Sequence, residues 1–279
     1  MRLYAISDLH LSRLDNWQAL AALPPCPEDW LLLAGDVCSH LGRFQQALDT
    51  LTQRFARVIW TPGNHDLWTH PRESASLRGV FKYNQMVAVC RQLGVLTPED
   101  PYCLWPGPGG PMRIAPIFTL YDYSFRPNHV PLDQAVAWAV ETGVLCADES
   151  LLHPDPFPSR QAWCAARCRY TEQRLSKAAA LGAPLLLVTH FPLRPDLARL
   201  RHIPRFSIWC GTRLTEEWHT RFPVVGVVFG HTHIRATHIV NHVRFEEVSL
   251  GYPGQWDARR GIAGYLREIQ PVSHPLLAA

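Results

Sequence analysis

Short apolar runs alternate with longer amphipathic stretches along the first part of the chain. The runs, near residues 2–7, 30–35 and 57–61, have the length and the Leu, Ile, Val and Trp content of buried strands. Between and after them, apolar residues recur at helical spacing near residues 15–22, 41–54 and 74–93. This β-α-β-α-β order predicts a parallel sheet with helices packed against it.

The pattern is less regular beyond residue 100. A reversal rich in Pro and Gly separates strand-like residues 102–105 from residues 112–121, which predicts a hairpin. Further along, we expect helices near residues 132–140, 160–181 and 212–220, and strands near residues 185–188, 224–229, 235–240 and 242–249. The whole chain is expected to be α/β.

Five short polar segments follow the strand-like runs. They are Asp8-Leu9-His10, Gly35-Asp36, Gly63-Asn64-His65-Asp66, Thr189-His190 and Gly230-His231-Thr232-His233. Four come directly after an apolar run, and the third segment follows its run by a Thr61-Pro62 turn. Because α/β folds usually carry their chemistry in the loops at strand ends, we expect these side chains to converge at one edge of a sheet.

The residue types suit a site for two metal ions. Asp8 and His10 lie two positions apart at a strand end, so both can reach one ion, and His231 and His233 repeat this spacing. A carboxylate has two oxygens, so Asp36 can bridge two ions. Asn64 would add a carbonyl oxygen and His190 would complete the second ion.

The charge of such a site predicts its chemistry. Two divalent ions outweigh two carboxylates and a hydroxide, so the site attracts an anion and can activate a phosphoester and a water. Nitrogen and oxygen ligands without a thiolate favour Mn, Fe or Zn over Ca or a structural Zn. A lone Asp-Leu-His or Thr-His is uninformative, but all five segments in this order are hard to explain as unrelated polar residues. The histidines outside the segments are most simply surface residues or polar residues with satisfied hydrogen bonds.

Composition agrees with a soluble enzyme. The chain has 279 residues, 47% of them hydrophobic and 18% charged, so it can bury a large core and is expected to form one domain, 1–279. A net charge of +3 without long basic runs predicts neither nucleic-acid nor membrane binding. A cleavable signal peptide would remove the candidate ligands Asp8 and His10, so the motif at residue 8 favours the cytoplasm. The eight cysteines form no C-x-x-C pair and are interpreted as free thiols of a reducing compartment.

The five segments together resemble the calcineurin-like metallophosphoesterase family, whose pattern is D-x-H, G-D, G-N-H-D/E, a lone His and G-H-x-H. The resemblance runs from residue 8 to 233 and implies two mixed β-sheets packed as a sandwich with helices outside. It implies one ion bound by Asp8, His10, Asp36 and His233, and a second bound by Asp36, Asn64, His190 and His231. It also implies that His65 contacts the phosphate and protonates the leaving oxygen, with Asp66 orienting the His65 ring.

The chain departs from the family pattern three residues after Asp36, where an Asp or Asn is common and Ser39, followed by His40, stands here. Two segments without metal motifs, near residues 98–160 and 192–212, are expected to form a cap or substrate cleft. Among their arginines, Arg126 and Arg205 are our candidates for binding the phosphoester, because a guanidinium matches phosphate oxygens.

Two segments near the ends of the chain resemble one bacterial subgroup, the phosphopantetheinyl hydrolases. The resemblance lies in the opening Met1-Arg2-Leu3-Tyr4-Ala5-Ile6-Ser7-Asp8-Leu9-His10-Leu11 and in Glu247-Val248-Ser249-Leu250-Gly251-Tyr252-Pro253 with Gln255-Trp256. It implies a phosphodiesterase that removes 4'-phosphopantetheine from an acyl or peptidyl carrier protein. A phosphodiesterase or phosphomonoesterase acting on a nucleotide or lipid precursor is the alternative. A non-catalytic interaction module would be expected to have lost ligands or His65, which this chain keeps.

Overall fold

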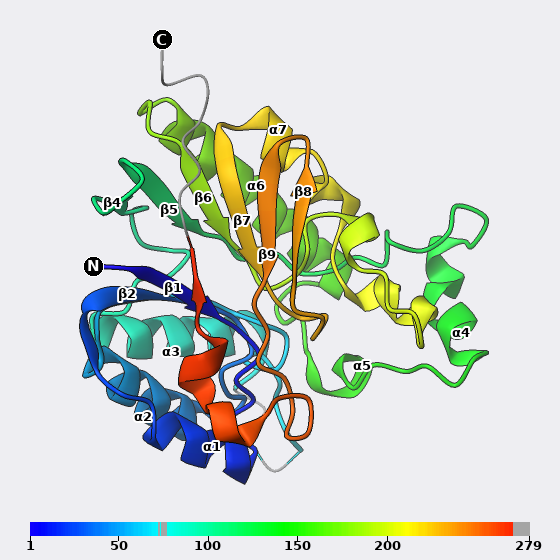
Figure 1. Ribbon diagram of the computed structural model, residues 1–279. Coiled ribbons are helices and arrows are strands. Elements are labelled where there is room, and N and C mark those ends of the chain that lie inside the picture. Colours follow the sequence, from blue (N-terminus) through cyan, green and yellow to red (C-terminus); the bar gives the residue numbers. More distant parts are fainter. Residues whose placement is uncertain (72, 74–76, 270–279) are drawn as a thin grey trace.

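Two β-sheets lie face to face in the computed structural model, which describes residues 1–71, 73 and 77–269 (Figure 1). The first sheet has the strand order β10-β1-β2-β3 and the second β4-β5-β6-β7-β9-β8. The strands of the first sheet are β1 (Leu3–Ile6), β2 (Cys26–Ala34), β3 (Phe55–Thr61) and β10 (Arg267–Glu268). Those of the second are β4 (Leu104–Trp105), β5 (Met112–Pro116), β6 (Leu185–Val188), β7 (Val224–Phe229), β8 (Ala236–Val240) and β9 (Val243–Glu247).

Both sheets are mixed. β1, β2 and β3 are parallel, and β10 pairs antiparallel with β1. In the second sheet β5, β6, β7 and β9 are parallel, while β4 and β8 run antiparallel at the two edges. The predicted sandwich of two mixed sheets with outer helices is therefore confirmed.

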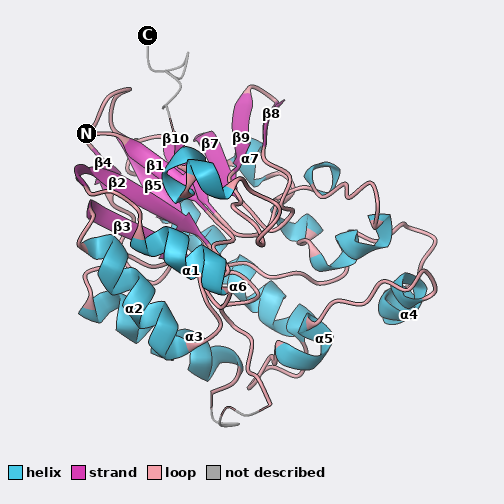
Figure 2. Cartoon of the chain, turned by 60° about the horizontal axis from the view of Figure 1, so that its bottom comes forward, coloured by secondary structure: helices cyan, strands magenta, loops and turns pink. Residues whose placement is uncertain are grey.

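Helices cover the outer faces of the sandwich. α1, α2 and α3 lie over the first sheet (Figure 2), and α6 lies behind the second (Figure 1). The α-helices are α1 (Leu14–Ala21), α2 (Leu41–Thr52), α3 (Gly79–Gln92), α4 (Ala135–Val140), α5 (Asp148–Leu151), α6 (Arg160–Ala179) and α7 (Trp218–Arg221). Short 3-10 helices are η1 (Leu132–Gln134), η2 (Pro195–Leu197), η3 (Pro204–Trp209), η4 (Arg213–Thr215), η5 (Ala258–Arg260) and η6 (Ile262–Tyr265).

The strands are apolar on both faces because each face packs against a different layer. Leu32 and Ala34 of β2 point into the core between the sheets, which also contains Ile114 and Val188. Leu31 and Leu33, at the alternate positions, belong to the core under the helices. Burial on both faces is the rule for parallel strands, and it explains the unbroken apolar runs in the sequence.

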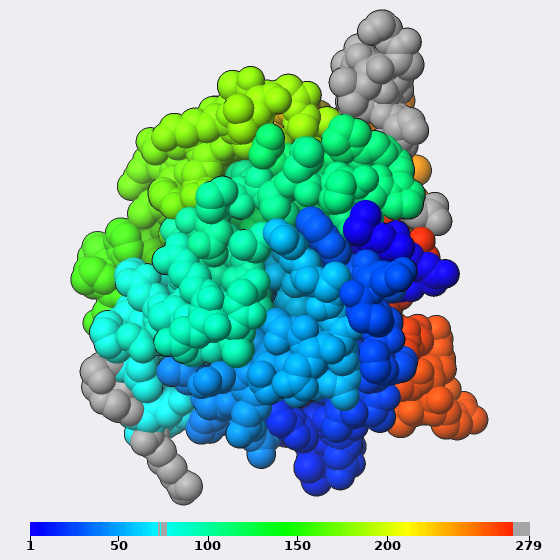
Figure 3. All heavy atoms as spheres, turned by 90° about the vertical axis from the view of Figure 1, so that its left-hand side faces the viewer, coloured from blue at the N-terminus to red at the C-terminus, as the bar shows by residue number. Residues whose placement is uncertain are grey.

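The C-terminal part of the described chain returns to its beginning. Tyr4 of β1 pairs with Glu268 of β10, and the indole of Trp256 donates a hydrogen bond to Asn16 in α1. In Figure 3 the orange and red residues accordingly lie beside the blue N-terminal ones. Residues around 250 are thereby held close to the loop after β1.

Several expected boundaries differ from the structure. β2 begins at Cys26 because a register shift lets it pair across Pro27, and β5 ends at Pro116, which has no N–H to donate to the ladder. α3 begins at Gly79, and residues 74–76 of the expected helix lie outside the described residues. The single helix expected near 212–220 is a 3-10 turn followed by the short α7. α5, η5, η6 and β10 were not expected from the sequence.

Among the described residues, we find no helix with the length and apolar character needed to cross a membrane.

Candidate metal centre

All five polar motifs lie in loops at the carboxyl ends of strands, three from the first sheet and two from the second. The loop backbone is left-handed at several acid and histidine positions. The φ angles are 53° at Asp8, 42° at His10, 55° at Asp36, 71° at His231 and 54° at His233. Each such residue costs about 1–3 kcal/mol of backbone strain, which proteins keep mainly at functional sites.

Two motif glycines are required by the close approach of these loops. Gly35 has φ of 89°, and a Cβ there would lie 2.5 Å from Nδ1 of His190. A Cβ on Gly63 would lie 2.0 Å from Oδ1 of Asp36. The Gly-Asp and Gly-Asn-His-Asp motifs therefore need glycine for steric reasons.

The first group of candidate ligands comprises Asp8, His10 and His233 together with Oδ2 of Asp36. Nε2 of His233 lies 3.1 Å from both Oδ1 of Asp8 and Nε2 of His10. Nε2 of His10 lies 4.0 Å from Oδ2 of Asp36. Four donor atoms thus point at one space, with spacings typical of neighbouring ligands at about 2.1 Å from an ion.

The second group comprises Asn64, His190 and His231 together with Oδ1 of Asp36. Nε2 of His190 lies 3.0 Å from Oδ1 of Asn64, 3.1 Å from Nδ1 of His231 and 3.6 Å from Oδ1 of Asp36. Nδ1 of His231 lies 3.1 Å from Oδ1 of Asn64. The structure therefore brings all seven predicted ligand residues together, and the two oxygens of Asp36 face different groups.

The protonation states fit cations at these positions. Burial lowers the pKa of His10 to about 3 and lowers the pKa values of His190 and His231, so these rings are neutral and have a lone pair to offer. Burial and the charge of Asp8 raise the pKa of Asp36 well above its usual range. Among these histidines only His233 is shifted toward its charged form because, despite its burial, the neighbouring Asp8 raises its pKa. Asp36 has no such partner in the described part of the chain, and divalent ions would supply the positive charge that favours its ionised form.

Surrounding groups fix the ligand atoms. Oδ2 of Asp8 accepts hydrogen bonds from the hydroxyls of Ser7 (2.6 Å) and Ser249 (2.7 Å), which leaves Oδ1 for the first group. Nδ1 of His190 donates to the carbonyl of Ala34 at 3.0 Å, and Nδ1 of His233 donates to Gln255 at 2.8 Å. In both rings Nε2 is then the nitrogen with the free lone pair, as metal-binding histidines require.

The structure corrects the expected role of Asp66. Its Oδ2 accepts from the backbone N–H groups of Asp36 and Gly63, each at 3.0 Å, and its Oδ1 accepts from Cys38 at 2.9 Å. These bonds hold the Gly-Asp loop against the Gly-Asn-His-Asp loop. Within the described residues, Asp66 therefore braces backbone and does not orient the ring of His65.

His65 lies beside the two groups of ligands. Its Nε2 is 3.8 Å from Oδ2 of Asp36 and 3.4 Å from the hydroxyl of Tyr252. Its ring lies against the indole of Trp68, with 3.5 Å between ring centroids. Burial and the neighbouring His10 lower the pKa of His65 well below its usual value. The ring thus borders both groups of donor atoms without belonging to either, and with His10 and Asp36 it forms a further cluster that could hold an ion.

A pocket of about 270 Å³ opens above these residues, lined by His10, Asp36 and His65 and by Arg13, Trp68 and Tyr252. The guanidinium of Arg13 lies 5.6 Å from the centre of the Tyr252 ring. Sequence reasoning missed Arg13 and Tyr252 as site residues. Arg13 lies three residues after His10, and Tyr252 lies in the segment already quoted for the subgroup, so proximity to these motifs was the available signal.

Neither predicted substrate-binding arginine lies in that pocket. Arg126 donates to the carbonyl of Val130 at 2.7 Å, and Arg205 pairs with Glu141 at 2.8 Å while stacking on Trp138. Arg126 is thus held within its own segment, and Arg205 is held by residues of the segment near 98–160. The structure does not bring them to the site, and Arg13 is the arginine that lines it.

Ser39 and His40, the positions that depart from the family pattern, lie at different depths. Ser39 is buried and its hydroxyl is 3.0 Å from Nε2 of His70. His40 is exposed and points toward Glu73, 3.8 Å away. Only Ser39 lines the pocket, where it offers a hydroxyl instead of a carboxylate or amide.

One buried acid outside the motifs touches the site. Asp148, on α5, accepts hydrogen bonds from Nδ2 of Asn64 at 2.9 Å and from the indole of Trp68 at 2.5 Å. It lies 84 residues from Asn64 in the sequence, in a segment with no recognisable motif. Local sequence carried no signal for this contact.

Three comparisons with known proteins agree on the family of this chain. The chain matches the family of calcineurin-like phosphoesterases over residues 1–235. It is 45% identical to acyl-carrier-protein phosphodiesterase PptH of Mycobacterium tuberculosis over 271 residues, which are 96% of this chain and 83% of that protein. The crystal structure of phosphopantetheinyl hydrolase (PptH) from the same organism matches with a TM-score of 0.91 and 44% identity, over 98% of this chain and 96% of that one.

Proposed function

Because the chain belongs to the calcineurin-like phosphoesterase family, we propose that it hydrolyses the phosphodiester that joins 4'-phosphopantetheine to a serine of a carrier protein. The family resemblance drawn from the motifs is confirmed, and the chain is a metal-dependent phosphoric ester hydrolase. The observation that carries the substrate is the 45% identity, over 96% of this chain, to a protein named for that activity.

We propose that Asp8, His10, Asp36 and His233 hold one ion, and that Asn64, His190 and His231 hold a second that shares Asp36. The arrangement of donor atoms supports this, since the two oxygens of Asp36 face the two groups. Nitrogen and oxygen donors fit Mn, Fe or Zn. When bound, two such ions supply Lewis-acid activation of the phosphoester and of the attacking water.

His65 is the proposed proton donor to the leaving serine oxygen. Its ring borders the pocket beside Asp36 and is held by Trp68 and Tyr252. The half-buried ring is neutral on its own, but the negative charge of a bound phosphodiester favours its protonated form. A positioned acid of this kind is required because a serine alkoxide is a poor leaving group.

Arg13 is proposed to contact the phosphate oxygens that face away from the ions. It lines the pocket on the side of Tyr252 and its guanidinium is exposed, so a substrate can reach it. A guanidinium binds two phosphate oxygens at once.

The segments near residues 98–160 and 192–212 are proposed to form the cap against which the carrier protein docks. Two contacts support this. The indole of Trp209 donates to Glu149 at 2.7 Å and so joins the two segments, and the ring of Phe206 lies 6.1 Å from that of His231. A cytoplasmic location is also proposed, since eight free cysteines suit a reducing compartment.

The proposal is tested by weighing holo carrier protein before and after treatment with the Mn-loaded enzyme. We expect its mass to fall by one phosphopantetheine and to leave a free serine, while Asp36→Ala leaves the mass unchanged. Unchanged mass under conditions where a simple diester is hydrolysed would favour a small-molecule phosphodiesterase. No turnover of any phosphoester by protein that carries two ions would favour an interaction module.

A further inference from the structure

Asp148 is a fully buried carboxylate that contacts the site from the cap. It has 0% exposure, and its Oδ1 accepts both from Nδ2 of Asn64 and from Nε1 of Trp68. It belongs to α5, which no motif marks. One carboxylate oxygen is thus shared by a candidate ligand of the second ion and by the ring beside His65.

The bond to Asn64 decides which end of its amide faces the ligand groups. An asparagine side chain has a carbonyl oxygen with lone pairs and an amino group without one available to a cation. With Nδ2 bound to Asp148, Oδ1 is the end that faces His190 and His231, at 3.0 and 3.1 Å. A rotated amide would present N–H donors there and could not coordinate.

The bond to Trp68 fixes the indole on which His65 rests. The ring of Trp68 lies 3.5 Å from that of His65, centroid to centroid. A fixed indole therefore restricts the position of the imidazole. The same oxygen of Asp148 accordingly sets the geometry of both side chains.

Asp148 is itself held by a network within the cap. Arg160 donates to the carbonyls of Asp148 (2.7 Å) and Glu149 (2.9 Å) and pairs with the Glu149 carboxylate at 2.9 Å. That carboxylate also accepts from Tyr123 and Trp209, each at 2.7 Å. The cap therefore places α5 rigidly against Asn64.

We infer that Asp148 is a positioning residue, which orients the amide of Asn64 toward the second ion and fixes Trp68 against His65. The inference rests on the proposed dinuclear site. It is tested by metal binding, so its failure can be told from failure of the proposed activity.

The first experiment measures the affinity of each site for Mn²⁺ by competition with a chelator, together with the electron paramagnetic resonance signal of the coupled pair. Asp148→Ala should weaken one of the two ions about 10- to 100-fold, the usual effect of removing a group that orients a ligand, and leave the other unchanged. Asn64→Ala should weaken the same ion. The double variant should lose no more than Asn64→Ala alone, because both changes remove one interaction.

A control separates positioning from loss of stability. Glu99→Ala removes a half-buried carboxylate that accepts hydrogen bonds from Tyr83 and Arg167, neither of which is a candidate ligand. It should lower Tm while both Mn²⁺ affinities stay within about twofold of wild type. Any fall in Tm for Asp148→Ala is then distinguishable from its effect on the second ion.

A second pair of variants keeps the test decisive if Asp148→Ala does not fold. Asp148→Leu fills the same buried space without an acceptor and should weaken the second ion as Asp148→Ala does. Asp148→Asn keeps an oxygen that can accept from Asn64 and should hold the affinity about tenfold above that of Asp148→Leu. Unchanged affinity for both ions in Asp148→Ala or Asp148→Leu, additive losses in the double variant, or equal losses in Asp148→Leu and Asp148→Asn would overturn the inference.

Discussion

His65 lines the pocket together with His10 and Asp36, but it belongs to neither of the two proposed groups of four donor atoms. His65→Ala should therefore keep both ions and lose about 10²- to 10⁴-fold in turnover of a diester with a poor leaving group. With a nitrophenolate leaving group, which needs no proton, the loss should be smaller. Steady-state rates on the two substrates check this, and equal losses on both would point to phosphate binding instead of proton transfer.

Arg13 provides a second residue-level prediction. Arg13→Ala should raise KM for a diester about tenfold and change kcat little, since the contact with phosphate is made in the ground state too. Arg126→Ala is the matched control, because that guanidinium is occupied within the cap and should leave KM unchanged. A larger effect on KM at Arg126 than at Arg13 would favour Arg126, the candidate chosen from the sequence, as the residue that binds the phosphoester.

The residues of the site differ in whether the neighbouring sequence reveals their place in the structure. The convergence of Asp8, His10, Asp36 and the other candidate ligands could be predicted because each lies in a contiguous motif at a strand end. Asp148 could not, since its contact with Asn64 spans 84 residues and depends on how the cap folds back. Asp66 was predicted with the wrong partner because sequence proximity to His65 does not reveal where the turn directs its carboxylate.

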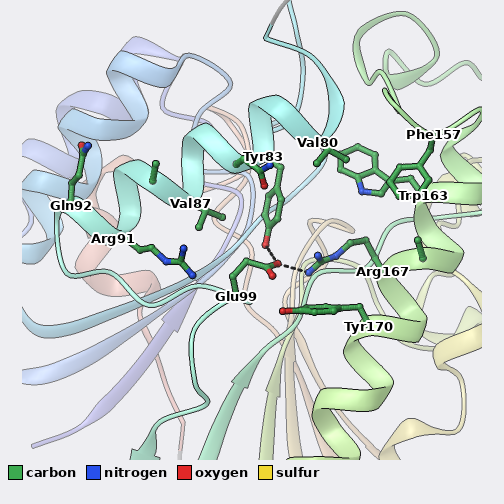
Figure 4. Close-up of a pocket in the computed structure, with 13 residues that line it drawn as sticks. Val80, Tyr83, Val87, Arg91, Gln92, Glu99, Phe157, Trp163, Arg167 and Tyr170 are labelled. Carbon is green, nitrogen blue, oxygen red and sulfur yellow. Dashed lines mark hydrogen bonds and ion pairs between the residues drawn. The ribbon is translucent and has the colours of Figure 1, made fainter.

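Among the helices, α3 and α6 are joined across a groove of about 830 Å³ by Glu99 (Figure 4). Its carboxylate accepts from Tyr83 at 2.6 Å and pairs with Arg167 at 2.7 Å. Burial alone would raise the pKa of Glu99, but Arg167 and the hydrogen bonds outweigh it, so the pKa is lowered. Glu99 therefore favours the folded state above its ordinary pKa of 4.5 and loses this contribution as pH falls through the lowered value.

Glu99→Gln should accordingly destabilise the metal-free protein by about 1–3 kcal/mol at pH 7 and by less below pH 4. Urea unfolding at the two pH values measures the difference. Asp257→Asn serves as control, since within residues 1–71, 73 and 77–269 the Asp257 carboxylate is bound only by Arg259 of its own turn, and its loss should leave stability close to wild type. If the loss of stability caused by Glu99→Gln grew as pH fell, this would contradict the lowered pKa of Glu99.

At the scale of elements, periodicity predicted the strands and helices that pack on both sides. β1, β3, β6 and β7 and the helices α2 and α6 lie where their apolar patterns placed them. α5 and β10 were missed because they have only four and two residues, too few for a period to be visible. Tertiary contacts determine these two elements, and local hydrophobic periodicity does not reveal such contacts.

For the whole molecule, the proposed ligands come from both sheets, with Asp8, Asp36 and Asn64 following strands of the first and His190 and His231 following strands of the second. Ions bound between them should therefore stabilise the sandwich. At a Mn²⁺ concentration 100 times Kd we expect a gain of about 2.7 kcal/mol per site and a clear rise in Tm. Thermal unfolding with Mn²⁺ and with chelator measures it, and an equal shift in Asp36→Ala would indicate binding elsewhere.

The central claim is that seven side chains form a dinuclear site bridged by Asp36. Elemental analysis of protein expressed with Mn supplementation tests it most directly. We predict about two ions of Mn, Fe or Zn per wild-type chain, none in Asp36→Ala, and about one in His10→Ala, because only Asp36 serves both ions. Wild-type protein without stoichiometric metal, or equal losses in the two variants, would contradict the claim.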